Sequence, residues 1–250
     1  MKKKYLFSSL LVGTLFLVAC GNDKVTISSD EGNDEKETAV EEEKDTQQEK
    51  AGKLEIQQSK AQAWVNSIGT VWVHSAAIYE NTGETSVEIG ETQMNYKGTN
   101  DSILGTSTMI YAVPEVVKPG ETAIIMESTI LDGLQSPDAF SETTFNFNFT
   151  ETDQDPNLME VSGIKGVSGE FGYKVTGLVK NPTEVPQDDV RIAAALFDAN
   201  GALLGALNGS VDVGIAPGGE AGFELSYPEL PEDVASKVAT IDVKSYGWTW

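Results

Sequence analysis

The stretch VRIAAALFDANGALLG, residues 190–205, decides the fold class of this 250-residue chain. Its apolar side chains at Val190, Ile192, Ala194 and Leu196 recur at every second position, which places them on one face of an extended strand. The turn that follows contains Asn200-Gly201, a pair typical of tight hairpins. The stretch therefore predicts a β-hairpin with one buried face.

The same alternation appears in other parts of the chain. In FNFNF, residues 145–149, the aromatic side chains fall on one face and the amides on the other, and residues 221–227 alternate in the same way. Turn signals such as ENTGET, KPGE, KNPTE and APGGE separate these runs. Many short strands at such intervals predict an all-β chain built from sandwiches.

A weak internal repeat divides the chain into halves. VWVHSAAIYENTGE, from Val71, aligns with FGYKVTGLVKNPTE at an offset of 100, which places Asn81 on Asn181. KPGETAIIM aligns with APGGEAGFE at an offset of 98, so two Pro-Gly turns coincide. Two copies of this size predict two tandem immunoglobulin-like β-sandwich domains, at residues 61–155 and 156–250.

The second half carries a more specific resemblance. GLVKNPTEVPQDDVRIAAALFDANGALLG is similar to the FxLYD domain family, with Leu196-Phe197-Asp198 at the Leu-Tyr-Asp positions and Ala194 where the leading Phe would stand. In the first half only Asn81, the strand at 94–96 and Pro119-Gly120 match. The resemblance implies small extracellular β-sandwiches and no defined reaction.

The N-terminus predicts export. Lysines at residues 2–4 precede an apolar run at 5–19 that is shorter than a membrane-spanning helix requires. Leu17-Val18-Ala19-Cys20 resembles the lipobox of bacterial prolipoproteins. That family implies a signal peptide at 1–19, and a diacylglycerol with fatty acyl chains such as palmitate on Cys20. The expected location is the extracellular face of a bacterial cell membrane. Cys20 is the only cysteine, so a disulfide within the chain has no second partner, whereas an uncleaved anchor stays open as an alternative.

Residues 20–60 predict a disordered acidic tether. Residues 21–60 contain 12 acids and 6 bases with few large apolar side chains, too little to offset chain entropy. A transient polar helix is the alternative, because the segment is rich in helix formers. The formal net charge of −22 lacks the basic footprint that nucleic-acid binding needs.

Residues that could carry chemistry are few. His74, the only histidine, alternates with Trp72 and Ala76 on a strand and is therefore expected to be half-exposed. A catalytic or zinc role is disfavoured, because such sites need clustered partners. Glu151, Asp153 and Asp155 in the connector at 150–158 could hold calcium, although a solvated acidic linker is the favoured interpretation. No other cofactor is expected.

The chain ends in SYGWTW, which places Tyr246, Trp248 and Trp250 on one face of a last strand. Core packing is the favoured role, and a ligand-facing aromatic platform is the alternative.

Together these features predict a surface lipoprotein that is not an enzyme. We expect a binding or assembly module that engages an envelope protein or a cell-wall component. The alternative is an envelope enzyme, or an accessory subunit of one, that acts on cell-wall polymers through surface carboxylates.

Overall fold

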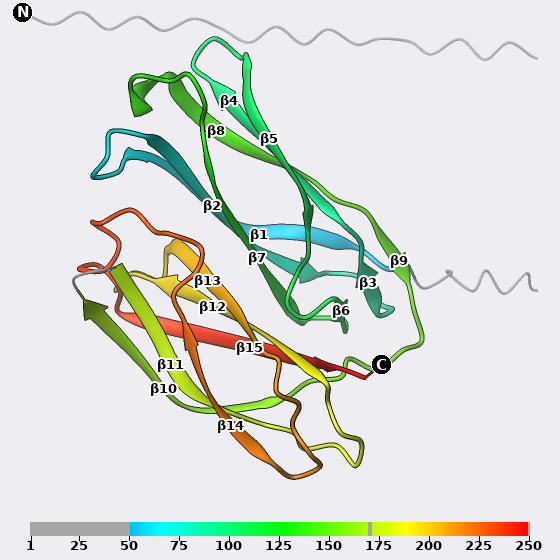
Figure 1. The fold of residues 1–250 in the computed structure, drawn as a ribbon. Coiled ribbons are helices and arrows are strands. Elements are labelled where there is room, and N and C mark those ends of the chain that lie inside the picture. Colours follow the sequence, from blue (N-terminus) through cyan, green and yellow to red (C-terminus); the bar gives the residue numbers. More distant parts are fainter. Residues whose placement is uncertain (1–50, 170–171, 250) are drawn as a thin grey trace, which may run out of the picture. The chain divides into compact units, whose positions relative to one another are not determined.

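The alternating segments form antiparallel strands in the computed structural model, which describes residues 51–169 and 172–249 (Figure 1). The strands of the first half are β1 (Leu54–Val65), β2 (Val71–Asn81), β3 (Val87–Ile89), β4 (Thr92–Gly98), β5 (Ile103–Ile110), β6 (Val116–Val117), β7 (Thr122–Ile130), β8 (Phe140–Asn146) and β9 (Phe149–Glu151). Those of the second half are β10 (Glu160–Gly169), β11 (Gly172–Lys180), β12 (Asp189–Phe197), β13 (Leu203–Val211), β14 (Glu220–Leu225) and β15 (Thr240–Trp248). A single 3₁₀ turn, Pro137–Ala139, precedes β8. The expected all-β sandwich fold is thereby confirmed.

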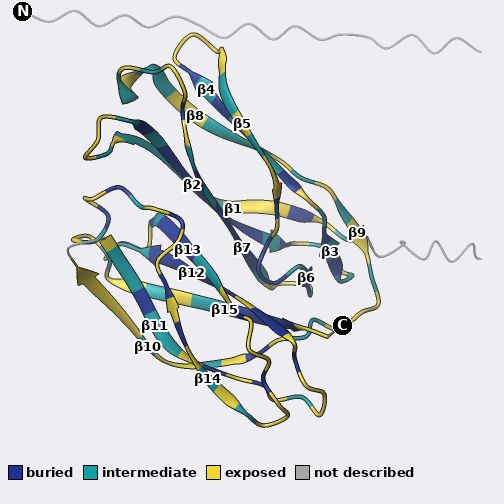
Figure 2. Ribbon diagram, in the orientation of Figure 1, coloured by how far each residue is buried: buried dark blue, intermediate teal, exposed yellow. Residues whose placement is uncertain are grey.

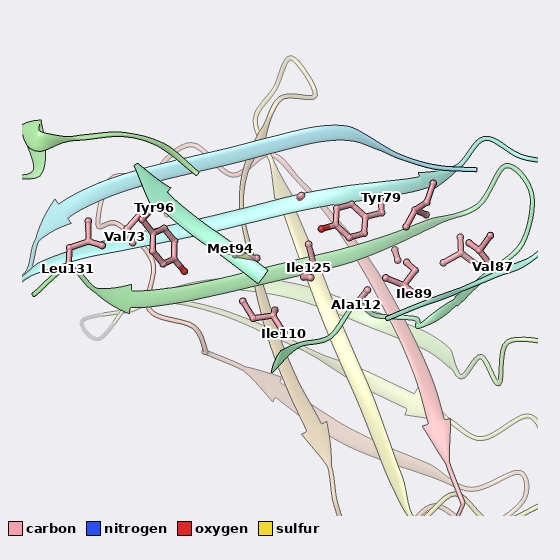
Figure 3. Packing of buried hydrophobic residues seen from close by; sticks show 14 of the residues in the cluster. Val73, Tyr79, Val87, Ile89, Met94, Tyr96, Ile110, Ala112, Ile125 and Leu131 are labelled. Atoms are coloured by element: carbon pink, nitrogen blue, oxygen red, sulfur yellow. The ribbon is translucent and has the colours of Figure 1, made fainter. Parts of the chain in front are cut away.

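The first sandwich packs the sheet β1-β2-β7 against the strands β5-β4-β8 and β6-β3-β9. Its core takes every second side chain of β2 and β4, among them Val73, Tyr79, Met94 and Tyr96 (Figure 3). The Tyr79 ring lies 4.6 Å from that of Phe147, so part of the alternating aromatic run also contacts this core.

The second sandwich packs β10-β11-β14 against β13-β12-β15. The alternating residues Val190, Ile192, Ala194 and Leu196 of β12 all lie in its core. The following turn is closed by Asp198, whose Oδ1 accepts hydrogen bonds from the backbone N–H groups of residues 200 and 202 at 2.7 and 2.9 Å. The predicted hairpin is confirmed.

The internal repeat corresponds to one repeated piece of structure. The side-chain amide of Asn81 donates to the carbonyl groups of Thr85 and Val117, at 2.8 Å each. Asn181 makes the matching bonds to Val185 and Ile215, at 2.8 and 2.9 Å. In both copies the backbone of the Asn also pairs with the Pro-Gly turn, whose glycine has a positive φ. The two turns that the repeat aligned are therefore held together by one buried asparagine in each sandwich.

The two sandwiches share a third buried cluster, which we call the interface cluster. It joins the outward faces of β2 and β7 to the outward faces of β12, β13 and β15, so that β2, β7 and β12 are buried on both faces over much of their length (Figure 2). Its buried members are Ala76, Ile78, Val113, Ile124, Met126, Ala193, Ala195, Leu203, Ala206 and Tyr246. The described residues of the two sandwiches accordingly form one compact unit.

The first sandwich starts earlier than the boundary that we placed after residue 60. β1 begins at Leu54 and pairs with β2 from Leu54 opposite Asn81 to Val65 opposite Val71. Residues 54–60 resemble a linker because most of their side chains face solvent on an edge strand. They also contact the second sandwich, since Gln58 Oε1 accepts a hydrogen bond from the backbone N–H of Leu203 at 3.0 Å. The signal peptide, Cys20 and the expected tether up to residue 50 lie outside the described residues.

Candidate functional site

A cleft of about 690 Å³ opens at the edge of the interface cluster. The first sandwich contributes residues at the end of β5 and after it, Met109, Ile110, Tyr111, Val113 and Glu115, and Met126 and Glu127 from β7. The remaining lining residues come from the second sandwich: Asp189, Arg191 and Ile192 of β12, Asn208, Gly209 and Ser210 of β13, Tyr227, and Tyr246 and Trp248 of β15. We call this hollow the interdomain cleft. Since both halves build it, it exists only while the two sandwiches stay docked.

Aromatic side chains line the cleft and remain partly open to solvent. Tyr111 and Tyr227 are 57% and 56% exposed, and Trp248 is 39% exposed, whereas Tyr246 is buried at its floor. The ring centroids of Tyr246 and Trp248 lie 6.1 Å apart. Burial raises the pKa of Tyr246 to about 12, so its hydroxyl stays protonated at neutral pH. Such rings offer both a flat apolar contact and a polar edge to a ligand.

The cleft has an acidic balance, with three carboxylates against one guanidinium. Arg191 is occupied by Asp189, since its Nε and Nη2 lie 2.8 and 2.6 Å from Asp189 Oδ2. Glu127 accepts a hydrogen bond from the Tyr227 hydroxyl at 3.0 Å, and this contact and burial raise the pKa of Tyr227 to about 12. Burial, together with the nearby charge of Glu88, also raises the pKa of Glu115.

Two carboxylate groups of the cleft lack full compensation. Within the described ranges, no hydrogen bond or ion pair engages the side chain of Glu115. Asp189 is only 8% exposed, and its Oδ1 has no hydrogen-bond partner in the part of the chain that is described. Glu115, which is half-buried and lines the cleft, therefore has capacity to accept donors from a ligand, whereas Asp189 Oδ1 is closed off from solvent.

His74 is not a half-exposed strand residue, as the sequence led us to expect, but is 1% exposed between the two sandwiches. Its Nε2 accepts a hydrogen bond from the backbone N–H of Ala206 at 3.1 Å. On the other side, Nδ1 lies 2.9 Å from Ser128 Oγ, which itself donates to the Glu229 carbonyl. This chain of bonds fixes the neutral Nδ1–H form of the ring, and burial lowers the pKa of His74 to about 3. Its role is to join the sandwiches.

The structure does not assemble the calcium site that we considered for Glu151, Asp153 and Asp155. Glu151 accepts a hydrogen bond from the backbone N–H of Gly52 at 2.7 Å, and Asp155 forms an ion pair with Lys118 at 2.7 Å. Among residues 51–169 and 172–249, no group of three or more His, Cys, Asp or Glu side chains is placed to hold a metal ion. Glu151 and Asp155 thus engage separate partners and do not converge on one point.

The C-terminal aromatic residues divide between the two roles that the sequence left open. Tyr246 is buried, as the favoured role predicted, but in the interface cluster and not in the core of its own sandwich. Trp248 instead stands partly exposed in the wall of the cleft, in agreement with the alternative of a ligand-facing platform. Trp250 lies outside the described residues. Spacing of two identified the shared face but could not show that this face meets the other sandwich at one end and a cleft at the other.

Sequence reasoning missed the remaining cleft residues. Tyr111 and Glu115 belong to a connection without any motif, and Tyr227 was assigned only to the alternating face of a strand. One local signal marks this region: Met109 has a φ of +57°, in the left-handed region that is strained for a side chain of its kind.

The part of the chain that the structure describes holds no helix of the length and apolarity needed to span a membrane.

Comparison with protein-family models finds no match for this chain, and no curated protein matches its sequence.

Proposed function

We propose that this protein is a non-catalytic binding module, held by a lipid on Cys20 at the extracellular face of a bacterial cell membrane, and that its ligand occupies the interdomain cleft. The anchor and the location rest on the lipobox-like sequence at residues 17–20. The FxLYD-like resemblance of the second half is in keeping with an extracellular sandwich. The cleft itself carries the binding part of the proposal.

The single observation behind this proposal is the set of exposed aromatic rings in a cleft between two docked sandwiches. Burying Tyr111, Tyr227 and Trp248 would be favourable, yet the fold leaves all three partly open to solvent. Concave sites with apolar walls and a few polar groups, placed where two domains meet, are the usual form of ligand sites. Exposed Tyr and Trp side chains are also enriched among residues that dominate binding energy.

The test is capture from cross-linked bacterial envelopes with the wild-type chain and the Tyr111→Ala variant. We expect a partner that the wild type retains and that Tyr111→Ala loses, because truncation removes an exposed ring of the cleft wall. The matched control is Ile68→Ala, which removes an even more exposed apolar side chain, 83% exposed, from the turn between β1 and β2. A partner retained equally by all three proteins would show that binding does not use the cleft.

The alternative function, an envelope enzyme or accessory subunit acting on wall polymers, is favoured by one observation. Glu115 lies in the cleft with a raised pKa, which is a property of general acids in glycoside hydrolysis. Release of soluble fragments from purified cell walls by the wild type, and its loss in Glu115→Gln, would support this alternative. If no fragments are released, and the envelope capture yields a partner that depends on the cleft, the binding module is supported.

A further inference from the structure

The interdomain cleft has a feature that its binding role leaves unexplained, namely negative charge without a counter-ion. Asp189 is neutralised by Arg191, whereas neither Glu115 nor Glu127 has an ion pair within the described ranges. A half-buried carboxylate without a partner is unfavourable, and natural sites retain such a group where a ligand compensates it. The whole chain, with its charge of −22, also attracts cations and repels anions.

The surroundings of Glu115 restrict the kind of cation. Hard metal ions need several oxygen ligands around one point, and among residues 51–169 and 172–249 no group of three or more His, Cys, Asp or Glu side chains is placed to hold one. The walls instead present aromatic rings and the thioethers of Met109 and Met126. Faces of Tyr and Trp rings attract organic cations, and Met and aromatic walls accept an alkyl stem.

We propose, on the basis of the binding function above, that the interdomain cleft takes an alkylammonium group, a protonated amine on an apolar stem, with Glu115 as its counter-ion. The aromatic rings of Tyr111, Tyr246 and Trp248 contact the cation and its stem. A neutral sugar would leave the Glu115 carboxylate without a counter-ion, so aromatic stacking alone does not account for the site.

The chain carries its own probes for this proposal. It has five methionines, of which Met109 and Met126 line the cleft while Met94 and Met159 lie in the cores of the two sandwiches. The methyl signals of the first pair should respond to a ligand in the cleft, and those of the second pair serve as internal controls. Methionine methyl NMR of the full chain thus reports both binding and its position.

The experiment titrates three probes of equal stem length: hexylammonium, hexanol and hexanoate. We expect hexylammonium to shift Met109 and Met126 alone, and to bind about tenfold more tightly than hexanol, since a charged hydrogen bond contributes on the order of tenfold in affinity. Hexanoate should bind least. High salt should weaken hexylammonium binding and leave hexanol binding unchanged.

Two variants separate charge from shape. Glu115→Gln should lower the affinity for hexylammonium about tenfold and leave that for hexanol unchanged, because only the ammonium loses a charged partner. Glu84→Gln removes one carboxylate from an exposed turn and should change neither affinity. Equal binding of hexylammonium and hexanol, or equal behaviour of the two variants, would overturn the ammonium assignment and leave the cleft as a binding site. A failure of all three probes to shift Met109 and Met126 would also overturn it, whereas the proposed function is judged separately by the envelope capture.

A last comparison identifies the source of the amine. A lysine-containing peptide should bind better than the same peptide with norleucine, which keeps the stem and lacks the charge. Tighter binding of the lysine peptide than of hexylammonium indicates a basic partner protein, and weaker binding indicates a free amine; both support the inference. A norleucine peptide that binds as well as the lysine peptide contradicts it.

Discussion

Mild acid should destabilise this protein through His74, because the folded state holds that ring in its neutral form. The ring accepts a hydrogen bond from Ala206 N–H at Nε2, and a proton added at this nitrogen would place two donors against each other. Its Nδ1–H already donates to Ser128, and the side chain is 1% exposed. Protonation of His74 therefore requires either that the contact between the two sandwiches breaks or that the chain unfolds.

The magnitude follows from the two pKa values. Burial lowers the pKa of His74 to about 3 in the folded state, against the ordinary value of 6.5 in the unfolded chain. The stability contribution is therefore complete above pH 6.5 and is lost as the pH falls from 6.5 towards about 3. Each pH unit within this window lowers the free energy of unfolding by about 1.4 kcal/mol. Between neutral pH and about pH 5 the expected loss is about 2 kcal/mol, and the whole window amounts to about 5 kcal/mol.

The assay is urea-induced unfolding of the full chain and of His74→Gln at about pH 7.5, 6 and 5. Glutamine keeps one acceptor and one donor but does not titrate, and no other histidine contributes. The difference in unfolding free energy between wild type and variant should shrink by about 2 kcal/mol on acidification. If the difference in unfolding free energy between wild type and variant stays constant with pH, His74 is not held in a buried, neutral form. If the variant does not fold, the ring signals of wild-type His74 decide instead: they should stay those of a neutral imidazole at about pH 5.

Three further predictions concern single positions. Asn81→Ala and Asn181→Ala should each lower the free energy of unfolding by about 3 kcal/mol in urea, because each leaves two carbonyl groups without their side-chain donor; a loss below about 1 kcal/mol would contradict this role. Gly205→Ala should cost about 2 kcal/mol in the same assay, since its Cβ would stand 2.8 Å from His74 Nε2, and unchanged stability would show that the interface is looser than described. Cys20→Ala should abolish labelled-lipid incorporation and release the protein from the membrane fraction, and a variant that still fractionates with membranes would refute the anchor.

Alternation of side chains predicted the strands β12 and β14 and the faces of them that form the core of the second sandwich, which carry Ile192, Leu196, Phe223 and Leu225 into that core. The aromatic run at 145–149 is divided between β8 and β9, and residues 54–60 of β1 were not predicted as a strand. The repeat likewise predicted the paired Asn and Pro-Gly turns. These features could be predicted because each depends on residues close together in the sequence or on a pattern that occurs twice in the chain.

The contact between the sandwiches could not be predicted, because it depends on the other faces of the same strands. Ala193 and Ala195 are small and apolar on the face that an isolated sandwich would expose, and they are buried against the first sandwich instead. The run of three alanines in β12 was thus a sign of burial on both faces. The same contact explains why the prediction that His74 is half-exposed was wrong. The cleft was missed for a related reason, since its residues are brought together only by the docking.

The docking joins unlike faces of two similar copies, because the first copy contributes β2 and β7 whereas the second contributes β12, β13 and β15. The offset of 100 places His74 and Ala76 of β2 on Lys174 and Thr176 of β11, yet the second copy meets the first through its other sheet, which contains β12. Such head-to-tail contacts can in principle add further copies without limit, on this chain or between chains. On the free sheet of the second copy Lys174 pairs with Glu224, and Leu178, which the same offset places on Ile78 of the interface cluster, is 40% exposed. The face that docks in the first copy is thus open to solvent in the second, with one ion pair and one exposed leucine in place of a buried contact.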